Sequence, residues 1–288
     1  MKMLLAFAAA GAMFAQTRGI VPEAVLMARP QPKAAAATAA GAKYLPVGDS
    51  ATPSIRQPST SRQVGVTIWR LRSAAPGDSG ARILVQEDSN TAEWVPERVG
   101  ANTSLREGDR VRLTIESPDA GYLYVIDRER YASGERGAPY LIFPTSRTRN
   151  GDNRVTGGKL LDIPAQDDRP NSFTLRHSRP DQSEEELTVI LTPEPLKGLD
   201  IGPKALALTS ELVAGWEKQW GAGNVQRFEL SGGAGKTWTR AEQEAAADRT
   251  RLLTQEDPAP QTVYRVSAKP NEPLLVRVRL RYSPAAKR

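Results

Sequence analysis

The stretch GDRVRLTIESPDAGYLYVIDRERYASGERGAPYLIFP, residues 108–144, contains three runs that each favour a β-strand. Apolar and polar residues alternate over 111–116, which is the period of a half-buried strand. Residues 122–126 are continuously apolar, as in a strand that is buried on both faces. The third run, 140–143, is followed by Pro144, which has no N–H to donate to a β-ladder.

A turn separates the first two of these runs. Within residues 117–121, Pro118 presets φ and Gly121 can adopt a positive φ. We therefore expect the first two runs to form a hairpin. The third run should add a further strand to the same antiparallel sheet.

Further strand-like runs lie on both sides of this stretch, with short turns between them. Pro96 places the run that contains it at the edge of a sheet. The spacing predicts a mainly β fold, an immunoglobulin-like antiparallel β-sandwich over residues 63–200. The additional runs are 64–72, 82–85, 93–96, 159–164, 172–176 and 186–191.

Residues 201–288 predict an α+β extension of two helices and two to three strands, packed on the sandwich. An apolar stripe at helical spacing predicts a first helix, capped by Thr209 or Ser210. A capping box at 239–242 predicts a second helix that runs to about Leu253. The strands of this extension either join the main sheet or form a separate domain. The stripe consists of Leu212, Val213, Trp216 and Trp220, and the expected strands are 225–230, 262–267 and 274–282.

The composition excludes several kinds of chemistry. The 288 residues suffice for one large domain or two small ones. There is no cysteine and one histidine, His177, which excludes disulfides, cysteine nucleophiles, cysteine-based zinc sites and multi-histidine metal sites. The formal net charge of +6 permits anionic partners but does not select among nucleic acid, lipid and acidic polysaccharide.

The first residues, MKMLLAFAAAGAMFAQ, have the pattern of a signal peptide. Lys2 precedes an apolar segment, residues 3–14, that is too short to span a bilayer. We expect cleavage after Ala15 and an exported protein, periplasmic or secreted; the alternative is a short buried helix. Residues 16–62 are rich in Ala, Pro, Ser and Thr, so we expect a disordered tether. No later stretch of the sequence predicts a transmembrane helix.

Two short motifs match known signatures only in part. GDSG, residues 77–80, matches the nucleophile motif of serine peptidases, but the single histidine, His177, follows it far along the chain. GGAGKT, residues 232–237, resembles a phosphate-binding loop, but Leu230 stands where the first glycine of that motif belongs. We interpret the first as a polar hairpin loop and the second as a glycine-rich connector.

Two acidic clusters, residues 167–168 and 184–186, can supply paired carboxylates for glycoside hydrolysis or Ca²⁺ binding. Neither has the spacing of a calcium loop, so we expect solvated loop charge. His177 lies between Arg176 and Arg179. We expect it at the surface, with a catalytic base as the alternative.

Arginines alternate with apolar residues on three of the predicted strands. Alternate side chains share one face of a strand. If these strands are neighbours, their arginines form one cationic plate that can hold phosphate, sulfate or carboxylate groups. The alternative is an ordinary solvated face with cross-strand glutamate partners. Trp69 and Trp94 either stack beside the plate or belong to the core. The arginines are Arg70, Arg72, Arg110, Arg112, Arg277, Arg279 and Arg281.

The motifs GDRVRL at 108–113, GYLYV at 121–125 and LIFP at 141–144 occur in this order, followed by Ile163 and Pro164. In these residues the chain resembles a bacterial domain family of unknown function, DUF4384, over about residues 105–196. The resemblance implies a compact, mostly β domain without assigned catalytic residues. Such domains occur in exported proteins and beside kinase or caspase-like peptidase domains.

We therefore expect a non-enzymatic, exported envelope protein that acts as a binding or interaction module. Its partner would be an envelope protein or an anionic glycan held by the arginine-rich face, and we expect no nucleic acid, cofactor or metal. One alternative is a carboxylate-dependent envelope hydrolase, favoured by two carboxylates about 5–10 Å apart in a cleft. Another is a structural subunit of an envelope assembly, favoured by a large exposed apolar patch.

Overall fold

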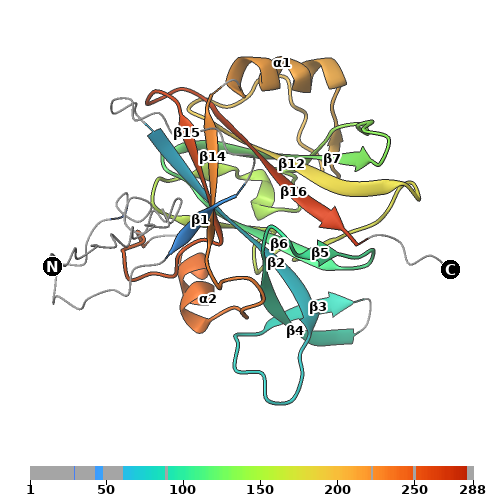
Figure 1. The fold of residues 1–288 in the computed structure, drawn as a ribbon, viewed down its shortest axis with the longest axis vertical. Helices are drawn as coiled ribbons and strands as arrows, with labels where there is room; N and C mark the ends of the chain where they lie inside the picture. Colours follow the sequence, from blue (N-terminus) through green and yellow to red (C-terminus); the bar gives the residue numbers. More distant parts are fainter. Residues whose placement is uncertain are drawn as a thin grey trace, which may run out of the picture.

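Two β-sheets pack face to face in the computed structural model, which describes residue 29 and residues 43–47, 61–87, 90–221, 223–248 and 251–283 (Figure 1). Helix α1 (Ser210–Trp220) lies on sheet B and helix α2 (Arg240–Ala247) on sheet A. The prediction of a β-sandwich with a two-helix C-terminal extension is confirmed. The predicted signal peptide and most of the predicted tether lie outside the described residues.

In the described ranges, the strands divide into a nine-stranded sheet A and a seven-stranded sheet B. Sheet A contains β1 (Tyr44–Pro46), β2 (Ser61–Ser73), β3 (Ile83–Glu87), β4 (Asn90–Val99), β6 (Arg110–Glu116), β10 (Leu160–Ile163), β11 (Phe173–Thr174), β14 (Val225–Leu230) and β15 (Thr262–Ser267). Sheet B contains β5 (Ser104–Leu105), β7 (Gly121–Tyr131), β8 (Tyr140–Phe143), β9 (Arg154–Val155), β12 (Gln182–Thr192), β13 (Leu206–Ala207) and β16 (Leu274–Tyr282). A short 3₁₀ turn, η1 (Arg149–Gly151), precedes β9.

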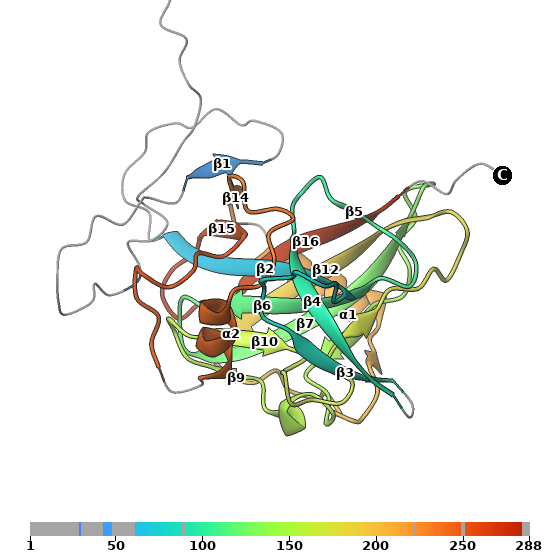
Figure 2. The same cartoon turned by 90° about the horizontal axis from the view of Figure 1, so that it is seen from below.

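The long strand β2 organises sheet A. Its first half pairs with β15 and its second half with β4, while β6 runs along its other edge (Figure 2). Beyond β15 the sheet continues through β14 to β1. In sheet B the order is β13-β8-β7-β12-β16-β5, with β9 beside β7. The described pairs are antiparallel except β16 with β5, which is parallel.

Apolar side chains from both sheets fill the space between them. Val66 and Leu113 come from sheet A, and Val125, Val189 and Val276 come from sheet B. Each is at most 2% exposed. Because full burial of one such side chain contributes about 1.5–3 kcal/mol, this shared core holds the two sheets together.

The expected hairpin between the runs 111–116 and 122–126 is wrong. β6 belongs to sheet A and β7 to sheet B, so residues 117–120 cross from one sheet to the other. Glycine is required at the end of this crossing, because a Cβ on Gly121 would lie 2.4 Å from the carbonyl oxygen of Thr192. The third run does pair with the second, as β8 with β7.

Strand β4 is longer than expected and lies between β2 and β3 rather than at an edge. Pro96 is opposite Leu71 of β2. On the other side, the pairing with β3 ends at Ile83 and Trp94. Pro96 therefore lies beyond the part of β4 that β3 contacts, and its missing N–H removes no bond to that strand.

The three C-terminal strands have the predicted bounds and do not form a sheet of their own. β14 and β15 join sheet A, whereas β16 lies between β12 and β5 in sheet B. The last third of the chain thus contributes strands to both layers of the sandwich.

Both helices begin at a predicted cap. Thr209 caps α1, and Thr239 with Glu242 forms a complete capping box on α2. Helix α2 ends at Ala247 rather than near Leu253. Leu253 is 1% exposed and lies in an irregular segment instead, so its apolar side chain is buried without being part of the helix.

Parts of the predicted tether are ordered against the sandwich. Tyr44–Pro46 form β1 at the edge of sheet A, and Arg29 is 4% exposed. β2 begins at Ser61, three residues before the predicted strand. For these residues the expectation of disorder is wrong.

Candidate binding face

The seven predicted arginines do not form one plate. Three of them lie on β16 of sheet B and four on β2 and β6 of sheet A. The register of β2 on β6 divides the four arginines of sheet A between its two faces. Arg112 is opposite Trp69, whereas Arg70 is opposite Val111. Paired residues point to the same side of a sheet, so Arg70 and Arg112 point to opposite faces. The expectation of a single cationic plate is wrong.

Arg112 belongs to the interior of the protein. Its side chain is 2% exposed and donates through Nη2 to Asp162 at 3.1 Å and to the carbonyl oxygen of Pro164 at 2.9 Å. Burial raises the pKa of Asp162, and Arg112 and Thr114 oppose that effect. The guanidinium also lies 5.5 Å from the ring centroid of Trp238. Arg112 therefore stabilises the layer between sheet A and α2. On the same strand, Arg110 lies over Trp94.

Arg70 and Arg72 are held by acids at the far end of β2. Both donate to Glu97, at 3.1 Å and 2.5 Å. Arg72 also forms a two-pronged ion pair with Asp78. The bonds from Arg72 and from the Ala75 N–H hold the pKa of Asp78 below its usual range.

The outer face of sheet B carries the three remaining arginines. Arg277, Arg279 and Arg281 alternate along β16 with residues of the core. Their side chains are 41%, 45% and 55% exposed. This strand thus presents its arginines to solvent, as its sequence pattern predicts.

Glutamates of the neighbouring strand lie between arginines on both sides. Glu184 and Glu186 of β12 are directly opposite Arg281 and Arg279 of β16. On the other side of β12, Arg130 of β7 donates to Glu186 at 3.0 Å. Three adjacent strands therefore form rows of arginine, glutamate and arginine.

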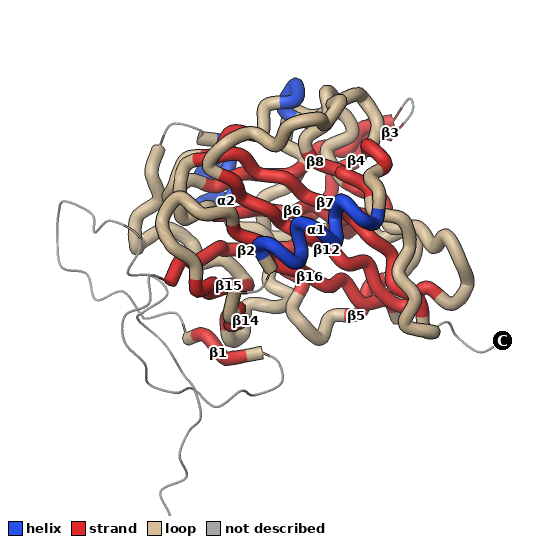
Figure 3. The backbone as a smooth tube through the Cα atoms, turned by 90° about the horizontal axis from the view of Figure 1, so that it is seen from above, coloured by secondary structure: helices blue, strands red, loops and turns tan. Residues whose placement is uncertain are grey.

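Helix α1 adds a third glutamate to this arrangement, since it lies across β7, β12 and β16 (Figure 3). Arg136 donates to Glu217 of α1 at 2.7 Å and to Glu186 at 2.5 Å, and Arg277 pairs with Glu217 at 3.3 Å. Burial by itself would raise the pKa of Glu217, but the bond from Arg136 and the nearby Arg277 lower it. We call this surface the β16 arginine face; it consists of Arg130, Arg136, Arg277, Arg279 and Arg281 above Glu184, Glu186 and Glu217.

The acids of the β16 arginine face lie deeper than its exposed cations. Glu186 is 1% exposed, and Glu217 and Glu184 are 11% and 17% exposed. The glutamates therefore lie beneath the guanidinium groups and pair with the exposed Arg277, Arg279 and Arg281 at 3.3–3.8 Å. A guanidinium presents a rigid fork of N–H donors, so neighbouring forks held in this way suit carboxylate, sulfate or phosphate oxygens.

The glutamate cluster was expected in a loop, and that expectation is wrong, because β12 begins at Gln182. The strand turns Glu184 and Glu186 outward and Glu185 inward. Sequence reasoning also missed Arg130, Arg136 and Glu217. The alternation of arginines over residues 127–130 contained a signal for Arg130, but Arg136 and Glu217 reach this face only through the tertiary fold.

Glu185 faces the core side of sheet B, next to Asp127 of β7. The two groups lie close enough for each to affect the pKa of the other. Burial and the neighbouring acid raise the pKa of Glu185 to about 8, and burial raises that of Asp127 to about 6. Tyr282 and Gln182 each donate to Glu185 at 2.8 Å. A glycoside hydrolase needs two carboxyl groups on either side of a substrate, whereas Glu185 is 6% exposed and bound by Tyr282 and Gln182.

The GDSG segment and His177 lie in different environments. In the GDSG loop, Asp78 is bound to Arg72 and accepts the Ala75 N–H at 2.6 Å. His177 is half-buried, with its ring edge-on to Tyr282 at 4.1 Å between centroids. Asp78 of the GDSG loop therefore anchors Arg72, and His177 packs against Tyr282.

The glycine-rich segment 232–237 packs against β4. Gly235 donates its N–H to the Arg98 carbonyl oxygen at 2.9 Å, and Arg98 donates its own N–H to Lys236 at 2.9 Å. Backbone N–H groups that already bind carbonyls do not cradle a phosphate. The segment is a connector that continues the pairing of β4.

A groove with a volume of 610 Å³ lies between α2 and the segment from β9 to β10. Arg149, Arg154 and Lys159 contribute cations to its wall, and Asp167 and Asp248 contribute acids. This mixture of charges gives the groove no single preferred sign. In the acidic cluster 167–168, Asp168 accepts the backbone N–H of Ala165 in its own loop and that of Arg149 in η1. Asp168 is 9% exposed, so the expectation of solvated loop charge is wrong for this residue.

The fold and this face define a two-sheet β-sandwich with a cationic outer layer. Residues 104–195 match the family described as "Domain of unknown function (DUF4384)", which confirms the resemblance found in the sequence. The match runs from β5 through β12, so it includes Arg130 and Glu186 but neither α1 nor β16. No curated protein and no solved structure matches the chain significantly. In the described part of the chain, neither helix is long and apolar enough to cross a membrane.

Proposed function

We propose that the protein is a non-enzymatic, exported binding module of the bacterial envelope, and that it holds an anionic partner on the β16 arginine face. The partner is an envelope protein or a glycan that presents carboxylate or sulfate groups. The observation that carries this proposal is the arrangement of Arg277, Arg279 and Arg281, which are exposed and form ion pairs at 3.3–3.8 Å with glutamates of β12 and α1. Export rests on the pattern of residues 1–15.

The β16 arginine face is better suited to binding a partner than the other arginines of the predicted plate. A flexible surface arginine loses side-chain entropy when it binds, but an arginine already held by an ion pair has lost much of it. Five arginines over three glutamates leave a formal charge of +2 on this surface. Arg112, in contrast, is enclosed with its acid and can meet no partner without local unfolding.

The test measures retention on immobilised heparin, a sulfated glycan used as a probe. The double variant Arg279→Gln/Arg281→Gln should elute at lower salt than the wild type, with affinity on the order of tenfold weaker. Arg154→Gln/Arg240→Gln is the matched control, because both side chains are exposed, at 73% and 87%, and the net charge changes equally.

Equal shifts for the two double variants would mean that net charge alone governs retention, and the proposal would be wrong. A pull-down from envelope extract, repeated at high salt, then identifies the natural partner. Partners held by the β16 arginine face should be lost at high salt, because salt screens exposed charges.

A further inference from the structure

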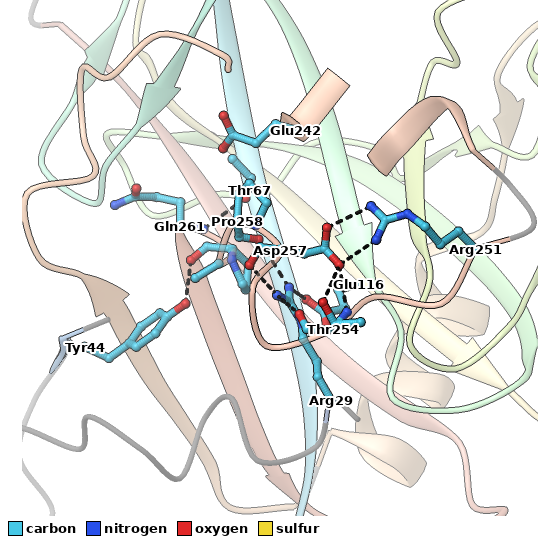
Figure 4. A network of polar contacts seen from close by, with 12 residues as sticks. Arg29, Tyr44, Thr67, Glu116, Glu242, Arg251, Thr254, Asp257, Pro258 and Gln261 are labelled. Carbon is cyan, nitrogen blue, oxygen red and sulfur yellow. Dashed lines mark hydrogen bonds and ion pairs between the residues drawn. The ribbon is translucent and has the colours of Figure 1, made fainter. Parts of the chain in front are cut away.

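Arg29 is bound in a pocket formed by residues far along the chain, which we call the Arg29 seat. Its Nε and Nη2 donate to both oxygens of Glu116, at 2.8 Å and 2.5 Å. Nη1 donates to the carbonyl oxygen of Asp257 at 2.8 Å, with those of Thr254 and Pro258 at 3.3 Å from the guanidinium nitrogens (Figure 4). A carboxylate fork and three converging carbonyls match a guanidinium in both shape and charge.

Tyr44 occupies a second pocket on the same side of the molecule, which we call the Tyr44 seat. Its ring is 0% exposed and packs with Phe228 and Val263, and its hydroxyl donates to the carbonyl oxygen of Pro260 at 2.9 Å. Around it, β1 adds to the edge of sheet A through pairing with β14. The Val47 N–H extends this pairing and donates to the carbonyl oxygen of Arg227 at 2.8 Å.

The two seats together have the features of a site for an extended segment. Strand addition to a sheet edge supplies backbone hydrogen bonds, and pockets for particular side chains supply specificity. Here one pocket takes an aromatic ring and the other takes an arginine. The occupant is the arm of the chain itself, defined here as Arg29 with residues 43–47.

The arm makes the same contacts whether it binds to the sandwich of its own chain or to the sandwich of another copy. Residues 48–60 connect the arm to β2, and 13 residues can span at most about 45 Å when extended. Arm exchange requires that the second body dock within this reach. In a reciprocal pair every contact of the two seats is made twice, as in exchange of an identical element between protomers.

We propose that the Tyr44 and Arg29 seats accept the arm of a second copy, which gives a dimer by reciprocal arm exchange. The contacts are the same in both arrangements, so concentration decides between them. A tethered segment competes at an effective concentration on the order of millimolar. Exchange should therefore be populated as the protein approaches that concentration, and the surface is separate from the β16 arginine face on sheet B.

The absence of cysteine from the chain permits a direct test with full-length protein. Leu45 of β1 is directly opposite Glu229 of β14. Directly opposed residues in an antiparallel pair lie about 4.5–5.5 Å apart at Cα, which is within the range of a disulfide. The variants Leu45→Cys and Glu229→Cys, one of them with a tag that changes its size, are mixed at about 1 mM and oxidised mildly.

Arm exchange predicts a cross-linked heterodimer, resolved on a non-reducing gel by the size tag. Leu84→Cys mixed with Glu229→Cys is the control for random cross-linking, since Leu84 is 59% exposed and lies on β3. Heterodimer from the Leu45 and Glu229 variants should exceed this control at least tenfold, and the excess should fall on dilution. No excess over the control would overturn the proposal.

The double variant Leu45→Cys/Glu229→Cys checks that the arm is seated and that the bond can form. It should lose its free thiols as a monomer in dilute solution. Glu229 also accepts the Ala101 N–H, so Val47→Cys with Arg227→Cys provides a second pair that leaves this bond intact. If neither pair closes within one chain, the arm does not occupy its seats, and this outcome also overturns the proposal.

Discussion

Arg112 of β6 and Asp162 of β10 form an ion pair enclosed beneath α2, with Nη2 and Oδ2 3.1 Å apart and side chains 2% and 5% exposed. Removal of one partner leaves a buried charge without compensation, which typically costs about 3–5 kcal/mol. Asp162→Asn should therefore lower the free energy of unfolding by about that amount. Arg112→Met/Asp162→Leu should cost less than the single change, because both charges are gone. Urea titration of both variants measures this difference, and a costlier double variant would contradict it.

The raised pKa values of Asp127 and Glu185 predict an unusual dependence of stability on pH. In the folded protein their pKa values are raised to about 6 and about 8, above the ordinary values of about 3.9 and 4.3. The folded state then binds more protons than the unfolded state between about pH 4 and pH 8. The contribution of this pair to stability is present at low pH and lost as pH rises through about 8.

Glu185→Gln keeps the shape of the protonated acid and removes its titration. We expect the variant to resemble the wild type near pH 5 and to be the more stable of the two near pH 9. Urea unfolding at pH 5, 7 and 9 measures the difference, with a slope in the wild type of up to about 1.4 kcal/mol per pH unit for each group. Parallel curves for the two proteins would show that Glu185 titrates at its ordinary pKa.

Glu186 holds three arginines of the β16 arginine face and is 1% exposed. Its replacement by glutamine leaves these guanidinium groups without their common carboxylate. We expect Glu186→Gln to cost about 3 kcal/mol of stability, and to be retained on heparin less strongly than Glu244→Gln, which changes the net charge equally, since the arginines lose their common carboxylate. Glu244→Gln is the control, because the exposed pair of Glu244 with Arg240 should contribute less than about 1 kcal/mol. Equal losses in the two variants would refute a special role for Glu186.

Glu242 has two structural tasks at once. It completes the capping box of α2 with Thr239, and it accepts hydrogen bonds from Arg98 with both side chains 7% exposed. Thr239→Ala should cost about 1 kcal/mol, as for loss of an N-cap. Glu242→Ala should cost at least about 3 kcal/mol, because it also leaves Arg98 buried without its acid. Thermal or urea unfolding compares the two, and similar costs would show that the Arg98 bond contributes little.

Local signals in the sequence predicted many elements correctly. The alternation over 274–282 predicted β16 with its arginines on one face, and the capping box predicted the start of α2. These features depend on a few neighbouring residues, so a short window contains them. The same window contains nothing about which strand lies alongside, and for this reason β6 and β7 were assigned to one sheet when they belong to two.

The sequence by itself determined the β-sandwich class, most strand positions, both helix caps and the absence of cysteine and multi-histidine chemistry. Only the tertiary structure decided what each charge does. Arg70 and Arg112 look alike in the sequence, but the register of β6 on β2 turns them to opposite faces of sheet A. Arg29 looks like part of a tether until Glu116 and residues 254–258 close around it. In each case the deciding partner is distant in sequence, because pairing and burial are set by the packing of the whole chain.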